Sequence, residues 1–265
     1  MRRLRKHRRS PGNRAATLKL LAAPLALILL CLLLSAPRVK KSDVCALKMP
    51  GDAILRVYQM NSRHGLDFAE LLAIYCFENK FFPDKSYDFS EAGIDTIKYG
   101  RHGRLRRSVR PYYEMFQTLL SEIECFPLET ADSPPYIYGD SWGTSASMTG
   151  CIILDRDNSS GRLLTRAMSA GAVESTGRDS AGGFRVTILT SGGTRFIYSR
   201  LSALADGIRP GAQIPAGAPV GFIGRGGKAR NPAGAVVSIS LKTRFGQIYI
   251  NPYPFLRYIE STGRL

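Results

Sequence analysis

Two serines on a predicted strand are the first residues in this sequence whose spacing could support chemistry. In the segment 233–242, Ser238 and Ser240 alternate with apolar residues, a period typical of a β-strand with one buried face and one face turned to a groove or to water. A serine becomes a nucleophile only beside a base. No histidine occurs in 136–265, and Lys242 would have to be buried and neutral. The alternative is a tolerated polar position.

A glutamate near the end of a predicted helix is a second candidate. The segment 65–81, G-L-D-F-A-E-L-L-A-I-Y-C-F-E-N-K-F, resembles the glutamate-bearing helix of goose-type and soluble lytic transglycosylases. That resemblance implies glycan cleavage with Glu78 as general acid, although Asn79 stands where those helices usually have a serine. The alternative is that Glu78 is a solvated or capping charge.

Thiolate chemistry has little support in the sequence. No C-x-x-C pair occurs, so neither a thiolate metal site nor a disulfide framework is indicated. Cys76 and Cys125 lie in apolar helical contexts and are expected to be small core residues, with one bridge between helices left open. The five cysteines are Cys31, Cys45, Cys76, Cys125 and Cys151.

The N-terminus predicts a membrane anchor. A basic segment, 1–17, is followed by the apolar run 18–36, whose only charge is Lys19, and this run is roughly the 20 residues that a spanning helix needs. A cleaved signal peptide is the alternative, but Pro37 disfavours cleavage after residue 36. We expect a single-pass protein of the cell membrane with a cytoplasmic N-terminus and an extracytoplasmic remainder.

Beyond the anchor, residues 37–128 predict a small extracytoplasmic helical domain. One helix fits 52–63, and a second begins at a capping box formed by Asp67 and Glu70. Both carry apolar residues at helical spacing, so we expect them to pack in a bundle.

A third helix is predicted over 112–126, with Pro111 as a favourable first helical residue. The basic run 101–110 before it is interpreted as a solvated loop, with contact to an anionic polymer as the alternative. The segment 129–135, E-T-A-D-S-P-P, is expected to be a linker.

From 136 to 265 the pattern changes to short strands separated by glycine turns. Strand-like runs every eight to twelve residues predict an antiparallel all-β domain. The expected fold class is therefore α+β, with a transmembrane helix, a helical domain and a β domain in that order.

Several segments of this β domain resemble the lysostaphin/LytM-type zinc endopeptidases of peptidoglycan, in order and over about 138–260. The last of them is similar to the ending of a clostridial-type branch that also carries an N-terminal helical region. The segments are D-S-W at 140–142, M-S-A-G-A-V-E-S-T-G at 168–177, G-G-F-R-V-T-I-L-T-S-G-G at 182–193, I-R-P-G-A-Q-I-P-A-G-A-P-V-G-F-I-G at 208–224 and I-N-P-Y-P-F-L-R-Y-I-E at 250–260.

The resemblance also implies where zinc chemistry would be located. The family's first histidine and aspartate ligands fall on Met148 and Ile152, and its H-x-H pair falls on Ser238 and Ser240. The histidine of its "YaHL" segment falls on Arg200. Methionine, isoleucine and serine do not supply the donors of a catalytic zinc site, and an arginine stays protonated.

A shift in alignment does not restore a ligand set. Within reach of the first motif it finds only Cys151, Asp155 and Asp157, and the three histidines, His7, His64 and His102, lie outside the β domain. We therefore expect a pseudoenzyme with no metal cofactor and no catalytic residues. An active zinc endopeptidase with displaced ligands is the alternative.

Degenerate members of this family act as scaffolds or activators of cell-wall hydrolases, or as parts of envelope complexes, including those of spore-forming bacteria. The resemblance thus implies binding to peptidoglycan, a cell-wall hydrolase or an envelope protein, with no nucleic-acid partner. Arg200, Ser238 and Ser240 are the predicted binding residues, because an arginine can pair with a stem-peptide carboxylate. The alternative is that Arg200 only extends to solvent.

Overall fold

The computed structural model describes residues 67–79, 107, 109–128, 136–142, 148–157, 163–180, 182–225, 232–243 and 246–263. The side chains of 74–79, 242, 243 and 246 lie outside this description, as do the predicted anchor, the helix at 52–63, most of the basic run and the linker. Within the described residues, no helix combines the length and apolar character needed to cross a bilayer.

Helix α4 (Phe68–Asn79) begins at the predicted capping box. The Glu70 amide donates to Asp67 Oδ1 at 2.7 Å, and the Asp67 amide donates to Glu70 Oε2 at 3.2 Å. Two amides at the helix start are thus satisfied reciprocally. The first turns also bury Phe68, Leu71 and Leu72.

Helix α6 (Arg110–Glu122) starts with Pro111 in its first turn, as predicted, but it ends four residues before the predicted boundary. Ile123 adopts an extended conformation, with φ −86° and ψ 113°. The amides of Glu124 and Cys125 then donate to the Met168 carbonyl rather than continuing the helix. Tertiary hydrogen bonds therefore override the helical spacing of the apolar residues.

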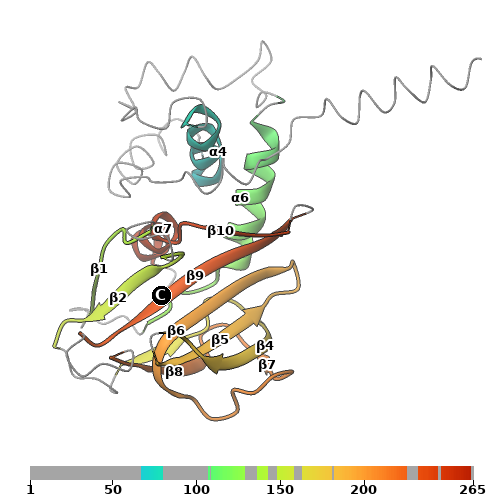
Figure 1. Ribbon diagram of the computed structural model, residues 1–265. Helices are drawn as coiled ribbons and strands as arrows, with labels where there is room; N and C mark the ends of the chain where they lie inside the picture. Colours follow the sequence, from blue (N-terminus) through green and yellow to red (C-terminus); the bar gives the residue numbers. More distant parts are fainter. Residues whose placement is uncertain are drawn as a thin grey trace, which may run out of the picture. The chain divides into compact units, whose positions relative to one another are not determined.

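The predicted antiparallel β domain is confirmed (Figure 1). All pairings of the described strands are antiparallel, and the main path runs β1-β2-β9-β6-β5-β4-β7. The strands are β1 (Tyr136–Tyr138), β2 (Cys151–Asp155), β3 (Leu164–Arg166), β4 (Gly171–Arg178), β5 (Phe184–Leu189), β6 (Thr194–Leu204), β7 (Gln213–Ile214), β8 (Pro219–Ile223), β9 (Gly234–Thr243) and β10 (Gly246–Ile250).

Strand β9 is the centre of this arrangement. Strand β6 pairs with one edge of β9, while β2 and β10 share the other edge in succession (Figure 1). Val237 is paired with Cys151 of β2, and Ile239 is paired with Ile250 of β10. Ser238 therefore lies where β2 gives way to β10.

The expectation of an all-β C-terminal domain is wrong at its end, because Tyr253–Thr262 form helix α7. Pro252 precedes the helix, and Gly263 closes it in the left-handed conformation (φ 65°) that glycine adopts without steric cost. Five side chains of α7 are buried: Tyr253, Pro254, Phe255, Leu256 and Ile259. This apolar face makes a helix the favourable structure here.

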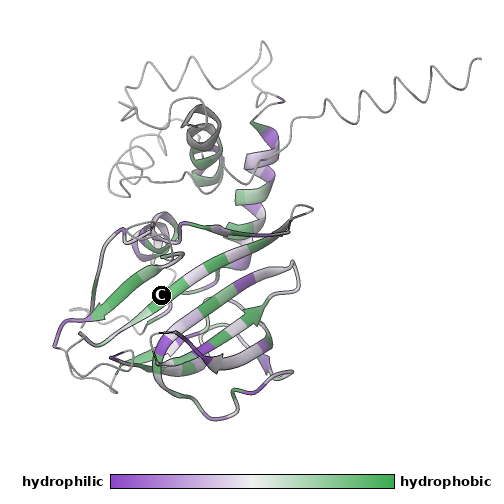
Figure 2. Cartoon of the chain, in the orientation of Figure 1, coloured by the Kyte–Doolittle hydropathy of each residue, from purple (hydrophilic) through white to green (hydrophobic). Residues whose placement is uncertain are grey.

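Aromatic side chains join α4 and α6 to α7. Phe68 of α4 stacks on Tyr258 with ring centroids 4.3 Å apart and meets Phe255 edge-on at 6.5 Å. Phe116 of α6 also contacts the Phe255 ring, at 5.9 Å. Figure 2 shows hydrophobic and hydrophilic residues mixed along α6 and the strands, as expected where each element buries one face.

Candidate functional site

The serine face of β9 is covered rather than open. Ser238 and Ser240 are 5% and 0% exposed, so the part of the prediction that turned this face to water is wrong. In the β6–β9 register, Ser238 is opposite Ile197 and Ser240 is opposite Arg195. Within the described part of the chain, Ser240 Oγ has no hydrogen-bond partner. The hydroxyls therefore have no base beside them that the structure describes.

The first ligand motif of the resemblance lies on this same face. Ile152 is opposite Val236 of β9, two residues from Ser238, so their side chains share a face. A Cβ added to Gly150 would collide with Ser238 Oγ. Position 150 therefore has to be a glycine where these two residues approach each other. Met148, two residues before Gly150, is half-buried. The register thus places Ile152, Gly150 and Ser238 together, although their side chains hold no metal donor set.

The Arg200 side chain is directed toward the start of β9, whereas an arginine that binds a ligand at the serine face would have to reach Ser238 or Ser240. It has φ 64°, in the left-handed region that costs a side-chain-bearing residue free energy. Its amide donates to Asp179 Oδ2, and its Nη2 donates to the Pro232 carbonyl at 3.1 Å. Pro232 precedes Ser238 by six residues, roughly 20 Å along an extended chain. The guanidinium therefore lies toward the start of β9, away from the serines.

An arginine that the sequence analysis did not select lies nearer to the serine face. Arg195, opposite Ser240, donates through Nε and Nη2 to the two carboxylate oxygens of Glu174 in β4, both at 2.6 Å. This bidentate pair raises the pKa of Arg195, chiefly through the hydrogen bonds to Glu174. The alternation in R-F-I-Y-S at 195–199 places Arg195 on the same face as Ile197, which the sequence alone indicates. Its partner Glu174 lies on β4, and their meeting depends on the pairing of β6 with β5 and of β5 with β4.

A polar pocket of about 250 Å³ adjoins this ion pair. Its walls come from β4, β5, β6 and β10, and they carry hydroxyl, amide and guanidinium groups. The lining residues are Glu174, Ser175, Thr176, Gly177, Arg185, Thr187, Arg195, Ile197 and Gln247. Such groups can bind a polar ligand. The one carboxylate among the lining residues, that of Glu174, is bound by Arg195 through both of its oxygens.

Two segments of the resemblance that lie far apart in sequence are joined by hydrogen bonds. Asn251 is fully buried, and its Nδ2 donates to both carboxylate oxygens of Asp140, at 3.1 and 3.2 Å. Asn251 Oδ1 also accepts the amide of Tyr253 at the start of α7. Next to Asp140, Ser141 Oγ accepts the amide of Ile152 at 2.8 Å. The D-S-W and N-P-Y segments thus fix the start of β2.

The zinc that the fold family implies does not fit these residues. Cys151 is fully buried on the opposite face of β2 from Ile152, and burial raises its pKa to about 12, which disfavours the thiolate a metal needs. Asp155 is also buried, and its Oδ1 accepts the amide of Asp157. No group of three or more His, Cys, Asp or Glu side chains suited to a metal ion occurs among the described residues.

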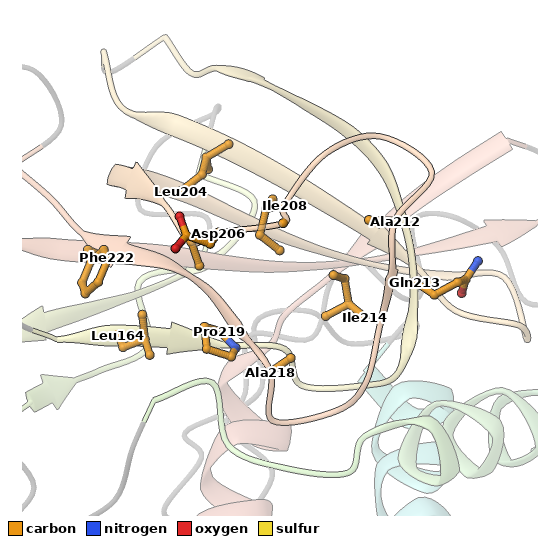
Figure 3. A pocket seen from close by; sticks show the side chains of 12 residues that line it. Leu164, Leu204, Asp206, Ile208, Ala212, Gln213, Ile214, Ala218, Pro219 and Phe222 are labelled. Atoms are coloured by element: carbon orange, nitrogen blue, oxygen red, sulfur yellow. The ribbon is translucent and has the colours of Figure 1, made fainter.

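A second, apolar pocket of about 540 Å³ lies beside β3, β7 and β8 and shares no lining residue with the polar one (Figure 3). Leu164, Ile208, Ile214 and Phe222 form much of its wall, and Asp206 is its ionisable residue. A single carboxylate among apolar side chains offers no acid–base or nucleophile pair, so this pocket has no catalytic arrangement.

Glu78, the alternative catalytic residue, is the penultimate residue of α4. The helical context predicted for it is therefore present. Its side chain lies outside the described residues, so the general-acid role stays a prediction.

The sequence matches no family model and no curated protein significantly. Solved structures do resemble it. A protein named as a glycyl-glycine endopeptidase LytM of Ruminococcus gnavus ATCC 29149 aligns with TM-score 0.55 and 21% identity, over 85% of this chain and 89% of that chain.

Two further structures align with lower scores. They are lysostaphin from Staphylococcus simulans (TM-score 0.39, 21% identity, 49% of this chain and 51% of that chain) and the catalytic domain of the prophage-encoded M23 protein EnpA from Enterococcus faecalis (0.37, 22%, 48% and 95%). The Ruminococcus alignment covers far more of this chain than these two. This chain has the LytM-type fold, as its sequence segments predicted.

Proposed function

We propose that this chain is a membrane-anchored, peptidase-like protein of the cell envelope that binds without cutting. It would act as a scaffold or regulator through peptidoglycan, a cell-wall hydrolase or an envelope complex. The apolar run 18–36 supports the anchor, because its length suits a spanning helix. The LytM-type fold supports an envelope role, since the Ruminococcus protein that shares it is named as a glycyl-glycine endopeptidase, and the family that the sequence segments resemble acts on peptidoglycan.

The observation that carries the proposal is a contrast within one face of the sheet. The supporting bonds are present, from Asn251 to Asp140 and from Ile152 to Ser141. These bonds support the position of Ile152, and Ser238 lies on the same face of β9; neither residue is a metal donor of a catalytic zinc site. We infer that a sheet that keeps these supporting hydrogen bonds but lacks zinc-donor side chains serves binding rather than hydrolysis.

The polar pocket supplies the chemistry for binding. It offers Thr187, Gln247 and Arg185 as hydrogen-bonding groups, while Arg195 is already paired with Glu174. A polar ligand with carboxylate or amide groups matches such a lining. Arg200 stays a predicted binding residue, and its test below is separate from that of the pocket.

The proposal is tested with the full chain purified in detergent micelles and incubated with isolated murein sacculi. We expect the protein to sediment with the sacculi, or to co-purify with an envelope protein. It should release no soluble muropeptides with or without added zinc. The variant Arg200→Gln should sediment less if Arg200 contacts the wall, whereas Arg110→Gln, on exposed α6, should behave as the parent. Muropeptide release that a chelator abolishes would show an active endopeptidase, and chelator-insensitive glycan cleavage would point to Glu78.

A further inference from the structure

Strand β4 lies at an outer position of the sheet, and its neighbour covers only its first residues. Strand β7 pairs with Gly171 and Ala172, and the chain just before β7 exchanges two backbone hydrogen bonds with Val173. From Ser175 onward, β4 has no paired strand on this side in the described part of the chain. Ser175, Gly177 and Arg178 are exposed there.

The backbone groups that point outward from this edge can be identified. The Asp179 amide donates to the Gly183 carbonyl across the β4–β5 hairpin. Because hydrogen-bonded residues alternate in an antiparallel pair, Arg178 and Thr176 direct their N–H and C=O groups away from β5. A register shift between Val173 and Ser175 places one extra residue before this stretch. The edge therefore presents four hydrogen-bonding groups, on Thr176 and Arg178.

The face beside this edge is open and positively charged. Gly177 is opposite Arg185 of β5, and Ser175 is opposite Thr187, so these four residues share a face. A Cβ added to Gly177 would meet no atom within 4 Å. Arg185 is exposed and makes no ion pair among the described residues, whereas Arg195, farther along the same pocket, is paired with Glu174.

We infer that the outer edge of β4 accepts an extended acidic segment of a partner protein as an added strand. The segment would hydrogen-bond to Thr176 and Arg178, and one of its carboxylates would enter the polar pocket and pair with Arg185. Strand addition uses main-chain bonds for affinity and alternate side chains for specificity. A strand added here lies about 10 Å from β5, a distance that an arginine and a glutamate bridge together.

This inference rests on the binding role proposed for the polar pocket and names its partner, but it needs neither an inactive metal site nor a membrane anchor. Loss of acidic-peptide binding with sedimentation on sacculi retained would remove the inference and leave the proposed function standing. An acidic protein segment is favoured over a glycan, because a glycan chain has no backbone amides to continue the sheet. The charge of the whole chain, formally +16, agrees with an acidic partner.

The test uses full-length protein in neutral detergent and a fluorescein-labelled, end-blocked peptide, Thr-Val-Glu-Val-Glu-Val-Thr. A twin peptide with lysines in place of the glutamates is the charge control. We expect saturable binding of the acidic peptide by fluorescence anisotropy, at least tenfold weaker binding of the basic twin, and lower deuterium uptake across 174–180 when the acidic peptide is bound.

Four variants separate the parts of the inference. Thr176→Pro removes the outward N–H and should weaken binding at least tenfold, whereas Thr176→Val keeps the N–H and should bind as the parent. Arg185→Gln should weaken acidic-peptide binding at least tenfold, and Gly177→Leu should do the same by filling the open space. If Thr176→Pro fails to fold by circular dichroism, Arg185→Gln and Gly177→Leu decide the question.

Three results would overturn the inference. The first is no saturable binding of the acidic peptide up to about 1 mM, a concentration that corresponds to only about 4 kcal/mol of binding free energy. The second is equal binding by folded variants and parent. The third is a dimer of the parent chain that Gly177→Leu dissociates, which would assign this edge to a second copy.

Discussion

Arg195 of β6 is opposite Ser240 of β9, and its guanidinium is bound by both carboxylate oxygens of Glu174. Ser240 occupies the position that the family resemblance assigns to a zinc ligand. A bidentate ion pair between β6 and β4 therefore lies beside a serine at the position where the resemblance implies a histidine.

Restoring the family's donors tests whether the framework is retained. The variant with Met148→His, Ile152→Asp, Arg200→His, Ser238→His and Ser240→His should bind one zinc per chain, because Ile152, Ser238 and Ser240 already share a face. Larger side chains at the buried serines should cost about 1–3 kcal/mol each in unfolding free energy. Zinc content by elemental mass spectrometry measures the gain.

The matched control for that variant keeps four of the changes and leaves Ser240 unchanged. It should hold less zinc by at least tenfold, because it lacks one ligand. A folded five-substitution variant that binds no more zinc than the parent would show that the framework is not preserved.

The Arg195–Glu174 pair should contribute modestly to stability. Its side chains are 19% and 35% exposed, so solvent screens the pair in part. A double-mutant cycle with Arg195→Gln and Glu174→Gln should give a coupling energy of about 1 kcal/mol. The exposed pair Arg110–Glu114 on α6, 2.8 Å apart, is the control and should give about 0.3–0.5 kcal/mol. Equal coupling in the two cycles would contradict a special role for the sheet pair.

Burial of Asn251 predicts a large effect from its removal. Asn251→Ala leaves Asp140 and the Tyr253 amide without this partner and should lower the free energy of unfolding by about 2–3 kcal/mol. Gln117→Ala, which removes an exposed amide from α6, should change it by less than about 0.5 kcal/mol. Denaturant unfolding monitored by circular dichroism measures both values, and a loss at Asn251 no greater than that at Gln117 would refute the bonding described.

The Cys151 thiol should be unreactive in the folded protein. Burial, followed by the nearby charge of Asp140, raises its pKa from 9.0 to about 12. At pH 8 its alkylation by iodoacetamide should be on the order of 10³-fold slower than in denatured protein, because the thiolate is the reactive form. Peptide mass spectrometry measures the rate at this cysteine.

The same shift has a consequence for stability in alkaline solution. The pKa of Cys151 in the folded protein lies above its ordinary value of 9.0. The buried neutral thiol therefore contributes fully to the free energy of unfolding below pH 9, and this contribution is lost as the pH rises from 9 toward 12. Cys151→Ala should therefore lose less stability than the parent over this range. Rapid native alkylation, or identical alkaline losses in the two proteins, would contradict the burial of this thiol.

Much of the fold could be predicted because its signals are local. The capping box at Asp67 and Glu70, the alternation along β9 and the glycine turns each depend on neighbouring residues. The end of α6 could not be predicted, because the amides after Ile123 bond to Met168. Helix α7 was missed even though its buried apolar residues and Gly263 were present in the sequence.

The candidate site was predicted in part, because some of its signals are also local in the sequence. Assigning Ser238, Ser240 and Ile152 to family positions required only the order of motifs, and the register places these residues on one face. The burial of the serines and the partner of Arg195 depend on strands distant in sequence and on the bulge in β4. Such register cannot be derived from periodicity alone.

Zinc binding by the unaltered full-length chain tests the central claim most directly. Metal-free protein is mixed with two equivalents of zinc, passed through a desalting column and assayed both for metal and for release of muropeptides from sacculi. The account predicts zinc far below one ion per chain in the β domain and no release. One retained zinc per chain together with release that a chelator stops would contradict it.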